Sequence, residues 1–329
     1  MQETESSAAL SDATEAELYR NLFRTMVLIR RFEEATQRLF LRGDVYGSTH
    51  LCVGQEAVSA GVVGALEERD WLACTYRGHG HVLARGCDPQ AFIDELVGRA
   101  TGMCGGRAGS MNVVDISRHL IGCFGIVGGS IGAATGVALA LRGTGAVAVA
   151  LFGDGAANQA YFHESLNFAK VNALPVLFVC ENNGYGEFTP TERTTPGGIV
   201  ARAAALEIPA SRVDGQDLFA VRAAALHAAA QARTDGPIFL EARTYRYSDH
   251  ARGDPVQYRP EGEMERWKAR DPIELARKRL VDDLLVPGEA LDQIVADVER
   301  QIEQMCERAL GAPFPDPSQG ATAYASTTS

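Results

Sequence analysis

The first part of the chain has apolar residues at the spacing of one helix face. From residue 15 to residue 42, apolar side chains return at intervals close to the helical repeat, and Gly43 follows directly. This period is typical of a helix that buries one side, and a glycine commonly ends such a helix. We therefore expect one long amphipathic helix over residues 15–42. The acidic, polar residues 1–15 are expected to form a disordered tail.

Two short apolar runs in the middle of the chain have a different pattern. AVAVALF covers residues 146–152 and PVLFVC covers residues 175–180. Continuous apolar runs of this length are typical of strands that are buried on both faces. The residues between them, up to Val171, follow a helical period. A strand, a helix and a second strand in this order predict a βαβ unit, and hence a parallel sheet.

The second half of the chain continues this alternation and then becomes helical. We expect a further helix over residues 217–233, a strand over 237–243, and closing helices over 272–285 and 287–310. Segments 187–198 and 247–263 are polar and rich in Pro, Gly and Arg, so they are expected to be exposed loops. The predicted fold class is α/β, with a central parallel sheet and helices on both faces. We expect one domain over residues 16–311 and a disordered tail over 312–329.

Composition narrows the classes of function. The 329 residues carry a net charge of −11, and no run of Lys and Arg is longer than three. Nucleic acids and anionic membranes require a basic surface, so a small molecule or a protein is the expected partner. The seven cysteines have no Cys-x-x-Cys pair and no zinc-ligand spacing, which is typical of reduced thiols in the cytoplasm. No apolar run reaches the roughly 18 residues of a membrane span, and the N-terminal residues resemble no targeting signal.

Polar residues follow both buried apolar runs. Asp154 comes just after the first run, and Asn183 follows the second. In open α/β sheets, ligands bind beyond the carboxyl ends of the strands, so these two side chains are expected to lie close together. With the backbone carbonyl of Tyr185 they offer three oxygen ligands and leave positions for two diphosphate oxygens and a water, which suits Mg²⁺. Gly153 and Gly155 allow backbone N–H groups to face anionic phosphates.

The spacing between these polar groups resembles a known motif. Gly153-Asp154-Gly155, then 26 residues, then Asn182-Asn183 is the thiamine-diphosphate motif, and an apolar strand precedes each half. Residues 23–309 also resemble the α subunits of thiamine-diphosphate-dependent E1 components from 2-oxo acid and acetoin dehydrogenase complexes. The segments that carry this resemblance are HLCVGQEA, TYRGHGHVLARG, GGRAGSMN, GIVGG, GDGAANQ, ENNGYGE and TYRYSDHARGDP. The resemblance implies the thiamine-diphosphate-binding fold, with thiamine diphosphate and Mg²⁺ as cofactors.

The resemblance also implies roles for individual residues. His250 matches a loop histidine at the reacting side of the cofactor, where a near-neutral pKa would let it move protons. Of His79 and His81, one is expected to line the site and the other to brace its loop, and His79 is taken as the second catalytic candidate. The role of His50 stays open. The implied cofactor-binding residues are Tyr76, Arg77, Gly125, Val127, Asp154, Gly155, Ala156, Asn183, Tyr185 and His250, of which Asp154, Asn183 and Tyr185 (through its carbonyl) are the implied Mg²⁺ ligands.

The resemblance further implies an obligatory partner. In this family the glutamate that activates the cofactor belongs to a β subunit, so an α₂β₂ heterotetramer is expected, with the cofactor at each α–β interface. Such an enzyme cleaves a bond next to the carbonyl of a small substrate and passes the acyl unit to the lipoyl domain of E2. The cofactor supplies the electron sink, and the protein supplies position and electrostatics.

The substrate stays open on the sequence alone. GHGHVLARGCD and ENNGYGEFTP resemble acetoin dehydrogenases, whereas TYRYSDHARGDP and GDGAANQ are shared with pyruvate-type enzymes. Ser248 and Asn112 stand where many relatives have histidine, which adds to the uncertainty about the substrate. An acyl transferase of secondary metabolism and a non-catalytic assembly subunit are the alternative functions.

Overall fold

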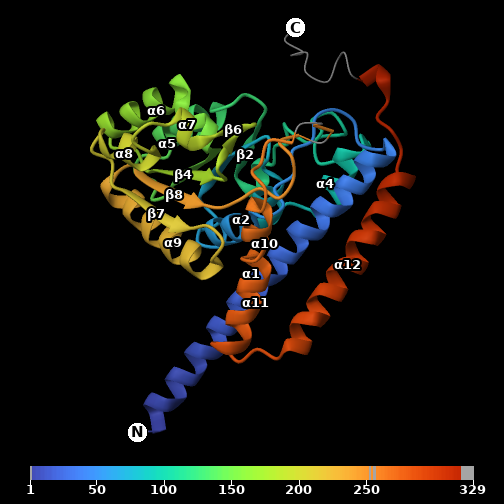
Figure 1. The fold of residues 1–329 in the computed structure, drawn as a ribbon, viewed down its shortest axis with the longest axis horizontal. Helices are drawn as coiled ribbons and strands as arrows, with labels where there is room; N and C mark the ends of the chain where they lie inside the picture. The colour runs from blue at the N-terminus through green and yellow to red at the C-terminus, as the bar shows by residue number, and fades with distance from the viewer. Residues whose placement is uncertain (1, 252, 255–256, 320–329) are drawn as a thin grey trace.

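A six-stranded parallel sheet forms the centre of the computed structural model, which describes residues 2–251, 253–254 and 257–319 (Figure 1). The strand order is β2-β1-β3-β4-β8-β7, and every neighbouring pair is parallel. The strands are β1 (Trp71–Thr75), β2 (Leu120–Phe124), β3 (Ala148–Gly153), β4 (Val176–Asn182), β7 (Ala210–Asp214) and β8 (Ile238–Arg243). A short antiparallel pair, β5 (Tyr185–Gly186) and β6 (Thr189–Pro190), lies apart from this sheet.

Helices cover both faces of the sheet. Figure 1 shows α5, α6 and α8 on one side of the sheet and α9 on the other, while α1 and α12 run next to each other beside it. The helices are α1 (Gln2–Arg42), α2 (Glu56–Val63), α3 (His79–Ala84), α4 (Pro89–Leu96), α5 (Gly129–Ala140), α6 (Ala160–Val171), α7 (Thr191–Thr194), α8 (Ile199–Ala204), α9 (Leu218–Asp235), α10 (Glu263–Lys268), α11 (Pro272–Asp282) and α12 (Gly288–Gly311), with short 3₁₀ turns η1 (Ile116–Arg118), η2 (Asp154–Asn158) and η3 (Pro317–Gln319). The predicted α/β class with a parallel sheet and helices on both faces is confirmed.

The apolar runs of the central strands supply both cores. Along β3, Val149 and Leu151 face the core that is shared with α1, α2 and α9, whereas Ala150 and Phe152 face the core that is shared with α5 and α6. Side chains alternate along a strand, so a strand that is covered on both faces must be apolar at every position. This is why the unbroken run at residues 146–152 predicted β3.

Helix starts follow the local chemistry of the sequence. The Asp217 side chain accepts hydrogen bonds from the backbone N–H groups of Phe219 and Ala220 and so caps α9. Asp271 caps α11 in the same way, with Pro272 at the first helical position. These caps explain why both helices begin within one residue of the predicted positions.

The structure differs from the sequence prediction at the two ends of the chain. Helix α1 continues back to Gln2, whereas residues 1–15 were expected to be a disordered tail. The stretch before residue 15 contains no glycine or proline, so nothing in it stops the helix that the packed part of α1 has nucleated. Within the expected C-terminal tail, the Pro313 carbonyl accepts a bond from Ala100 N at 2.9 Å, and the Phe314 ring lies 3.9 Å from the Arg99 guanidinium. Residues 320–329 lie outside the described residues.

No helix in the described part of the chain combines the length and the apolar character needed to cross a bilayer.

Candidate functional site

A cavity lies beyond the carboxyl ends of the central strands. Its walls come from residues that follow β1, β3, β4 and β8, together with the turn after β2. Because all of these strands are parallel, their carboxyl ends meet at one edge of the sheet, where ligands of open α/β folds bind. The predicted site residues that line the cavity are Tyr76, Arg77, Val127, Asp154, Gly155, Ala156, Asn183, Tyr185 and His250.

Asp154 and Asn183 follow adjacent strands, as the sequence predicted. Gly153 at the end of β3 pairs with Glu181 of β4, which places the residues just beyond both strands side by side. The Asp154 side chain is only 2% exposed. Burial raises the pKa of this carboxyl group, while the hydrogen bond donated by the Thr191 hydroxyl opposes the rise. A divalent cation bound to this carboxylate would compensate for its burial.

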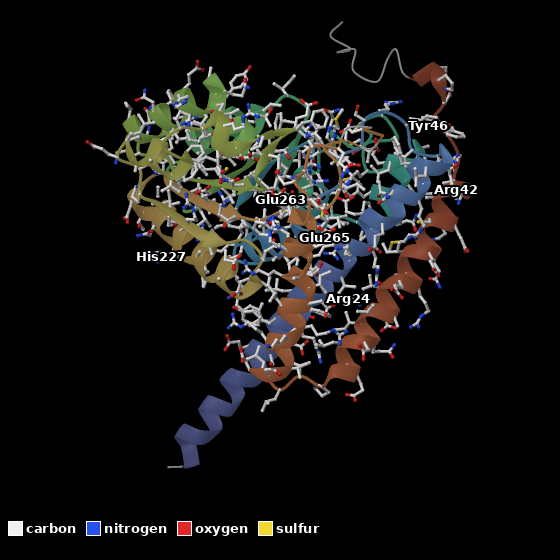
Figure 2. All side chains as sticks on the ribbon, viewed as in Figure 1. Arg24, Arg42, Tyr46, His227, Glu263 and Glu265 are labelled. Atoms are coloured by element: carbon white, nitrogen blue, oxygen red, sulfur yellow. The ribbon has the colours of Figure 1, made fainter. Side chains whose placement is uncertain are left out.

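The Asn183 amide group has a defined orientation. Its Nδ2 donates to the Gln55 Oε1 atom at 3.2 Å, and its Oδ1 accepts from the Tyr185 backbone N–H at 3.3 Å. The Tyr185 hydroxyl donates to Glu263 of α10 at 2.6 Å, and the Tyr245 hydroxyl donates to the same carboxylate at 3.0 Å. Glu263 is labelled in Figure 2. The backbone that carries the predicted Tyr185 carbonyl ligand is therefore anchored from a distant helix.

Two glycines bring the backbones around the predicted metal ligands into contact. A Cβ atom on Gly155 would lie 3.4 Å from the Cα atom of Gly186, and one on Gly186 would lie 3.3 Å from the Cα atom of Gly155. A Cβ atom at Gly186 would be tighter than an ordinary contact, and one at Gly155 would be at the limit of van der Waals contact, so the two backbones are close packed. This close approach holds Asp154 near the backbone of Tyr185.

Two buried arginines provide positive charge beside these oxygen ligands. Arg77 donates to the carbonyl oxygens of Leu51 at 2.7 Å and His250 at 2.9 Å. Burial, and then the nearby Arg246, lower the pKa of Arg77 to about 10. In the described part of the chain, neither guanidinium group pairs with a carboxylate. A buried pair of cations without a carboxylate in direct contact favours the binding of an anionic group.

His250 lies against both arginines. Its Nδ1 is 3.1 Å from Arg246 Nη1 and 3.5 Å from Arg77 Nη2. A guanidinium group only donates, so Nδ1 accepts and the neutral ring carries its proton on Nε2. Burial, followed by the charges of Arg77 and Arg246, lowers the pKa of His250 to about 4. The near-neutral pKa expected for His250 is therefore wrong. The sequence showed neither the burial of the ring nor the two arginines beside it.

Two of the predicted site residues do not line the cavity. The His79 ring is fully buried, with Nδ1 2.8 Å from Glu33 Oε2 and Nε2 2.7 Å from Ser110 Oγ. Both ring nitrogens are thus occupied by neighbours in the protein, which corresponds to the bracing role that was one of its two alternatives. Gly125 is exposed at the end of β2 and lies outside the cavity lining. Their catalytic and cofactor-binding roles stay predictions.

Three further histidines differ in burial. His50 is buried behind the lining, where its ring centroid lies 4.4 Å from that of Tyr76 and 5.1 Å from that of His250. Burial, and then Arg77, lower the pKa of His50 to about 3. His163 and His227 are exposed on their helices and lie outside the cavity lining, and His227 of α9 is labelled in Figure 2.

Sequence reasoning missed several polar residues of the site. Gln55, Glu181 and Arg246 line the cavity, and Thr191 donates to Asp154 from α7. The first three lie inside segments that carry the family resemblance, so their position in those segments was a usable signal. Thr191 had no such signal, because its segment was interpreted only as a polar loop.

The fold and the site define an α/β protein in which oxygen ligands at the strand ends lie beside two buried arginines, a combination that suits a cation bound to an anionic group. The model of the family described as "Dehydrogenase E1 component" matches residues 24–318. The chain belongs to the dehydrogenase E1 component family.

Individual relatives agree with this family. The α subunit of acetoin:2,6-dichlorophenolindophenol oxidoreductase from Cupriavidus necator is 41% identical over 319 residues, covering 95% of each chain. The α subunit with the same name from Bacillus subtilis is 40% identical, over 91% of this chain and 90% of that one. The pyruvate dehydrogenase E1 component subunit α of Rhizobium meliloti is 40% identical, over 90% of this chain and 87% of the relative. As the sequence resemblance predicted, the chain is an α-type subunit of a thiamine-diphosphate-dependent oxidoreductase.

Proposed function

We propose that this chain holds the Mg²⁺–diphosphate end of thiamine diphosphate in an E1 enzyme that acts on acetoin or on a 2-oxo acid such as pyruvate. The observation that carries the proposal is the position of Asp154 and Asn183 beyond two adjacent parallel strands, next to the backbone of Tyr185. One carboxylate and two neutral oxygens suit Mg²⁺ that also binds phosphate oxygens. Among the described residues, no cluster of three or more His, Cys, Asp and Glu side chains could hold a metal, so this mixed set is the candidate.

The other cavity residues complete the proposed binding site. Arg77, with Tyr76 beside it, neutralises the diphosphate, while the backbone N–H groups of Gly155 and Ala156 face it. An anion bound here would offset the two cations that lower the pKa of His250, and so bring that histidine closer to the range in which it can exchange protons. Thiamine diphosphate, when bound, supplies the electron sink for cleaving the bond next to the substrate carbonyl.

The exposed apolar rim of the cavity supports an obligatory partner. Ile126 and Val127 are 67% and 39% exposed, and Val127 is one of the cofactor-binding residues that the resemblance implies. Exposed apolar side chains at the edge of a site are typical of surfaces that a partner covers. We propose that a β subunit covers this rim in a cytoplasmic α₂β₂ heterotetramer, and that the lipoyl domain of E2 receives the acyl unit.

The isolated chain is expected to bind thiamine diphosphate weakly or not at all, because half of the proposed binding cleft is missing. Isothermal titration calorimetry with excess Mg²⁺ measures this directly. The same titration on the chain assembled with its β-type partner is the control and is expected to show tight binding. Micromolar binding by the isolated chain would contradict the proposed interface.

Substrate oxidation tests the proposed function as a whole. The assembled enzyme is expected to reduce 2,6-dichlorophenolindophenol when it is given acetoin, pyruvate or a branched-chain 2-oxo acid, with a requirement for thiamine diphosphate and Mg²⁺. The preferred substrate is the one with the largest kcat/KM. If no carbonyl substrate supports reduction although the cofactor binds, a non-catalytic assembly subunit or an acyl transferase becomes the better explanation.

A further inference from the structure

A series of buried polar side chains leads away from Asn183 into the protein. Asn183 Nδ2 lies 3.2 Å from Gln55 Oε1, and Gln55 Nε2 lies 3.3 Å from Glu181 Oε1. The second carboxylate oxygen, Glu181 Oε2, lies 2.9 Å from His81 Nε2. All four side chains are buried, so each contact is protected from competition by bulk water. We refer to Asn183, Gln55, Glu181 and His81 as the amide relay.

The chemistry of the groups gives the amide relay one direction. The Glu181 carboxylate accepts hydrogen bonds at both oxygens, so His81 must carry a proton on Nε2 and Gln55 must turn its NH₂ group toward Glu181. The carbonyl oxygen of Gln55 then faces Asn183 and accepts a hydrogen bond from the Asn183 NH₂ group. The carbonyl oxygen of Asn183 therefore lies on the side of the amide group that faces away from Gln55.

This orientation decides whether Asn183 can bind a cation. The two ends of an amide group have nearly the same shape, but only the oxygen has lone pairs to offer to Mg²⁺. If Asn183 turned over, its NH₂ group would be directed at the cation, and its oxygen would face the carbonyl oxygen of Gln55. The Tyr185 N–H donates to Asn183 Oδ1 at 3.3 Å and fixes the same orientation from the other side.

We propose that Gln55 is a positioning residue, which, through Glu181, keeps the amide oxygen of Asn183 directed at the metal. The inference rests on the proposed function, since it requires Asn183 to be a Mg²⁺ ligand. Groups that orient metal ligands commonly contribute a factor of 10 to 100 to metal affinity. Gln55 therefore acts through Asn183 and is distinct from the ligands themselves.

Exchanging the two side chains tests the direction of the amide relay. In the assembled enzyme, Glu181→Gln alone leaves one acceptor oxygen for two donors, His81 and Gln55, and Gln55→Glu alone places two carboxylates next to each other. Each single variant is expected to need roughly 10 to 100 times more Mg²⁺ for half-maximal thiamine diphosphate binding. The double variant Gln55→Glu/Glu181→Gln is expected to recover to within about threefold of the wild type. Its carboxylate at position 55 can accept from Asn183, and its amide at position 181 can accept from His81 and donate to position 55.

Control variants separate orientation from charge and from folding. Gln301→Glu on α12 makes the same chemical change next to Arg24, which is labelled on α1 in Figure 2, and it is expected to leave the Mg²⁺ requirement unchanged. Gln55→Met keeps the size of the side chain but cannot hydrogen-bond to the Asn183 amide. It is expected to need about ten times more Mg²⁺ for half-maximal thiamine diphosphate binding. This variant keeps the test decisive if the exchanged pair does not fold.

The readout is the Mg²⁺ concentration that supports half-maximal binding of thiamine diphosphate, measured by calorimetry. The inference is overturned if Gln55→Met keeps the wild-type requirement, or if the exchanged pair folds but performs no better than the worse single variant. Asn183→Ala distinguishes this failure from a failure of the proposed function. If Asn183→Ala raises the Mg²⁺ concentration needed for half-maximal binding while the Gln55 and Glu181 variants do not, only the proposed role of the amide relay is wrong. If Asn183→Ala also has no effect, the proposed metal site is wrong.

Discussion

Asp154→Ala is expected to weaken the binding of Mg²⁺ and thiamine diphosphate to the assembled enzyme by on the order of a thousandfold, or about 4 kcal/mol. Asp154 is the only carboxylate in the proposed ligand set, and its charge offsets the charge of the cation. Calorimetric titration of thiamine diphosphate in excess Mg²⁺ measures the loss.

The fold of the Asp154→Ala variant is expected to be intact. Burial raises the pKa of the Asp154 carboxyl group, so removing it also removes a desolvation cost in the absence of metal. The Thr191 hydroxyl keeps a possible acceptor, Asn182 Oδ1, at 3.5 Å. An unchanged melting temperature without cofactor, combined with lost binding, would support a ligand role. Near-normal cofactor affinity in the assembled variant would show that the metal assignment is wrong.

His250→Ala is expected to reduce acylation of the E2 lipoyl group by about 10²- to 10⁴-fold, the usual range for a lost general acid or base. Cofactor affinity should change much less, because Arg77 binds the backbone carbonyl of residue 250, which alanine retains. The informative comparison is between E2 acylation and reduction of an artificial electron acceptor. A loss confined to acylation would place His250 at the lipoyl step, and equal losses would place it at an earlier step.

His250→Gln is the matched variant for this prediction. A glutamine can still accept a hydrogen bond from Arg246, as Nδ1 of His250 does at 3.1 Å, but it cannot exchange a proton. If the glutamine variant is as inactive as the alanine variant, His250 moves a proton. If glutamine restores activity, the residue only positions Arg246. Full activity of His250→Ala in both assays would remove His250 from the mechanism.

The parts of the fold that sequence predicted best are those in which both faces of an element are buried. The apolar runs that became β3 and β4 carry their own signal, because every position along them faces a core. Asp154 and Asn183 could be located from the sequence for the same reason, since they follow these runs and parallel strands end at one edge. The start of α1 could not be predicted, because the residues before Glu15 contain no glycine or proline that would mark a boundary.

The side-chain environment of the site could not be predicted from the sequence. His79 and His81 are two residues apart in one segment, and both proved to be buried in contact with a carboxylate, Glu33 and Glu181 respectively. Burial, and then the charge of Arg77, lower the pKa of His250, and Arg77 is 173 positions away in the chain. Contacts of this kind arise only when β1, β4 and β8 come together in the sheet.

We propose that this chain supplies the Mg²⁺–diphosphate half of a thiamine-diphosphate site. Titration of thiamine diphosphate into the assembled α–β enzyme, with Mg²⁺ and again with the metal removed by a chelator, is the most direct test. We expect one cofactor per α chain in the presence of Mg²⁺ and binding that is weaker by about a hundredfold or more without it. Binding of equal affinity with and without the metal would contradict it, as would the absence of binding to the complete assembly.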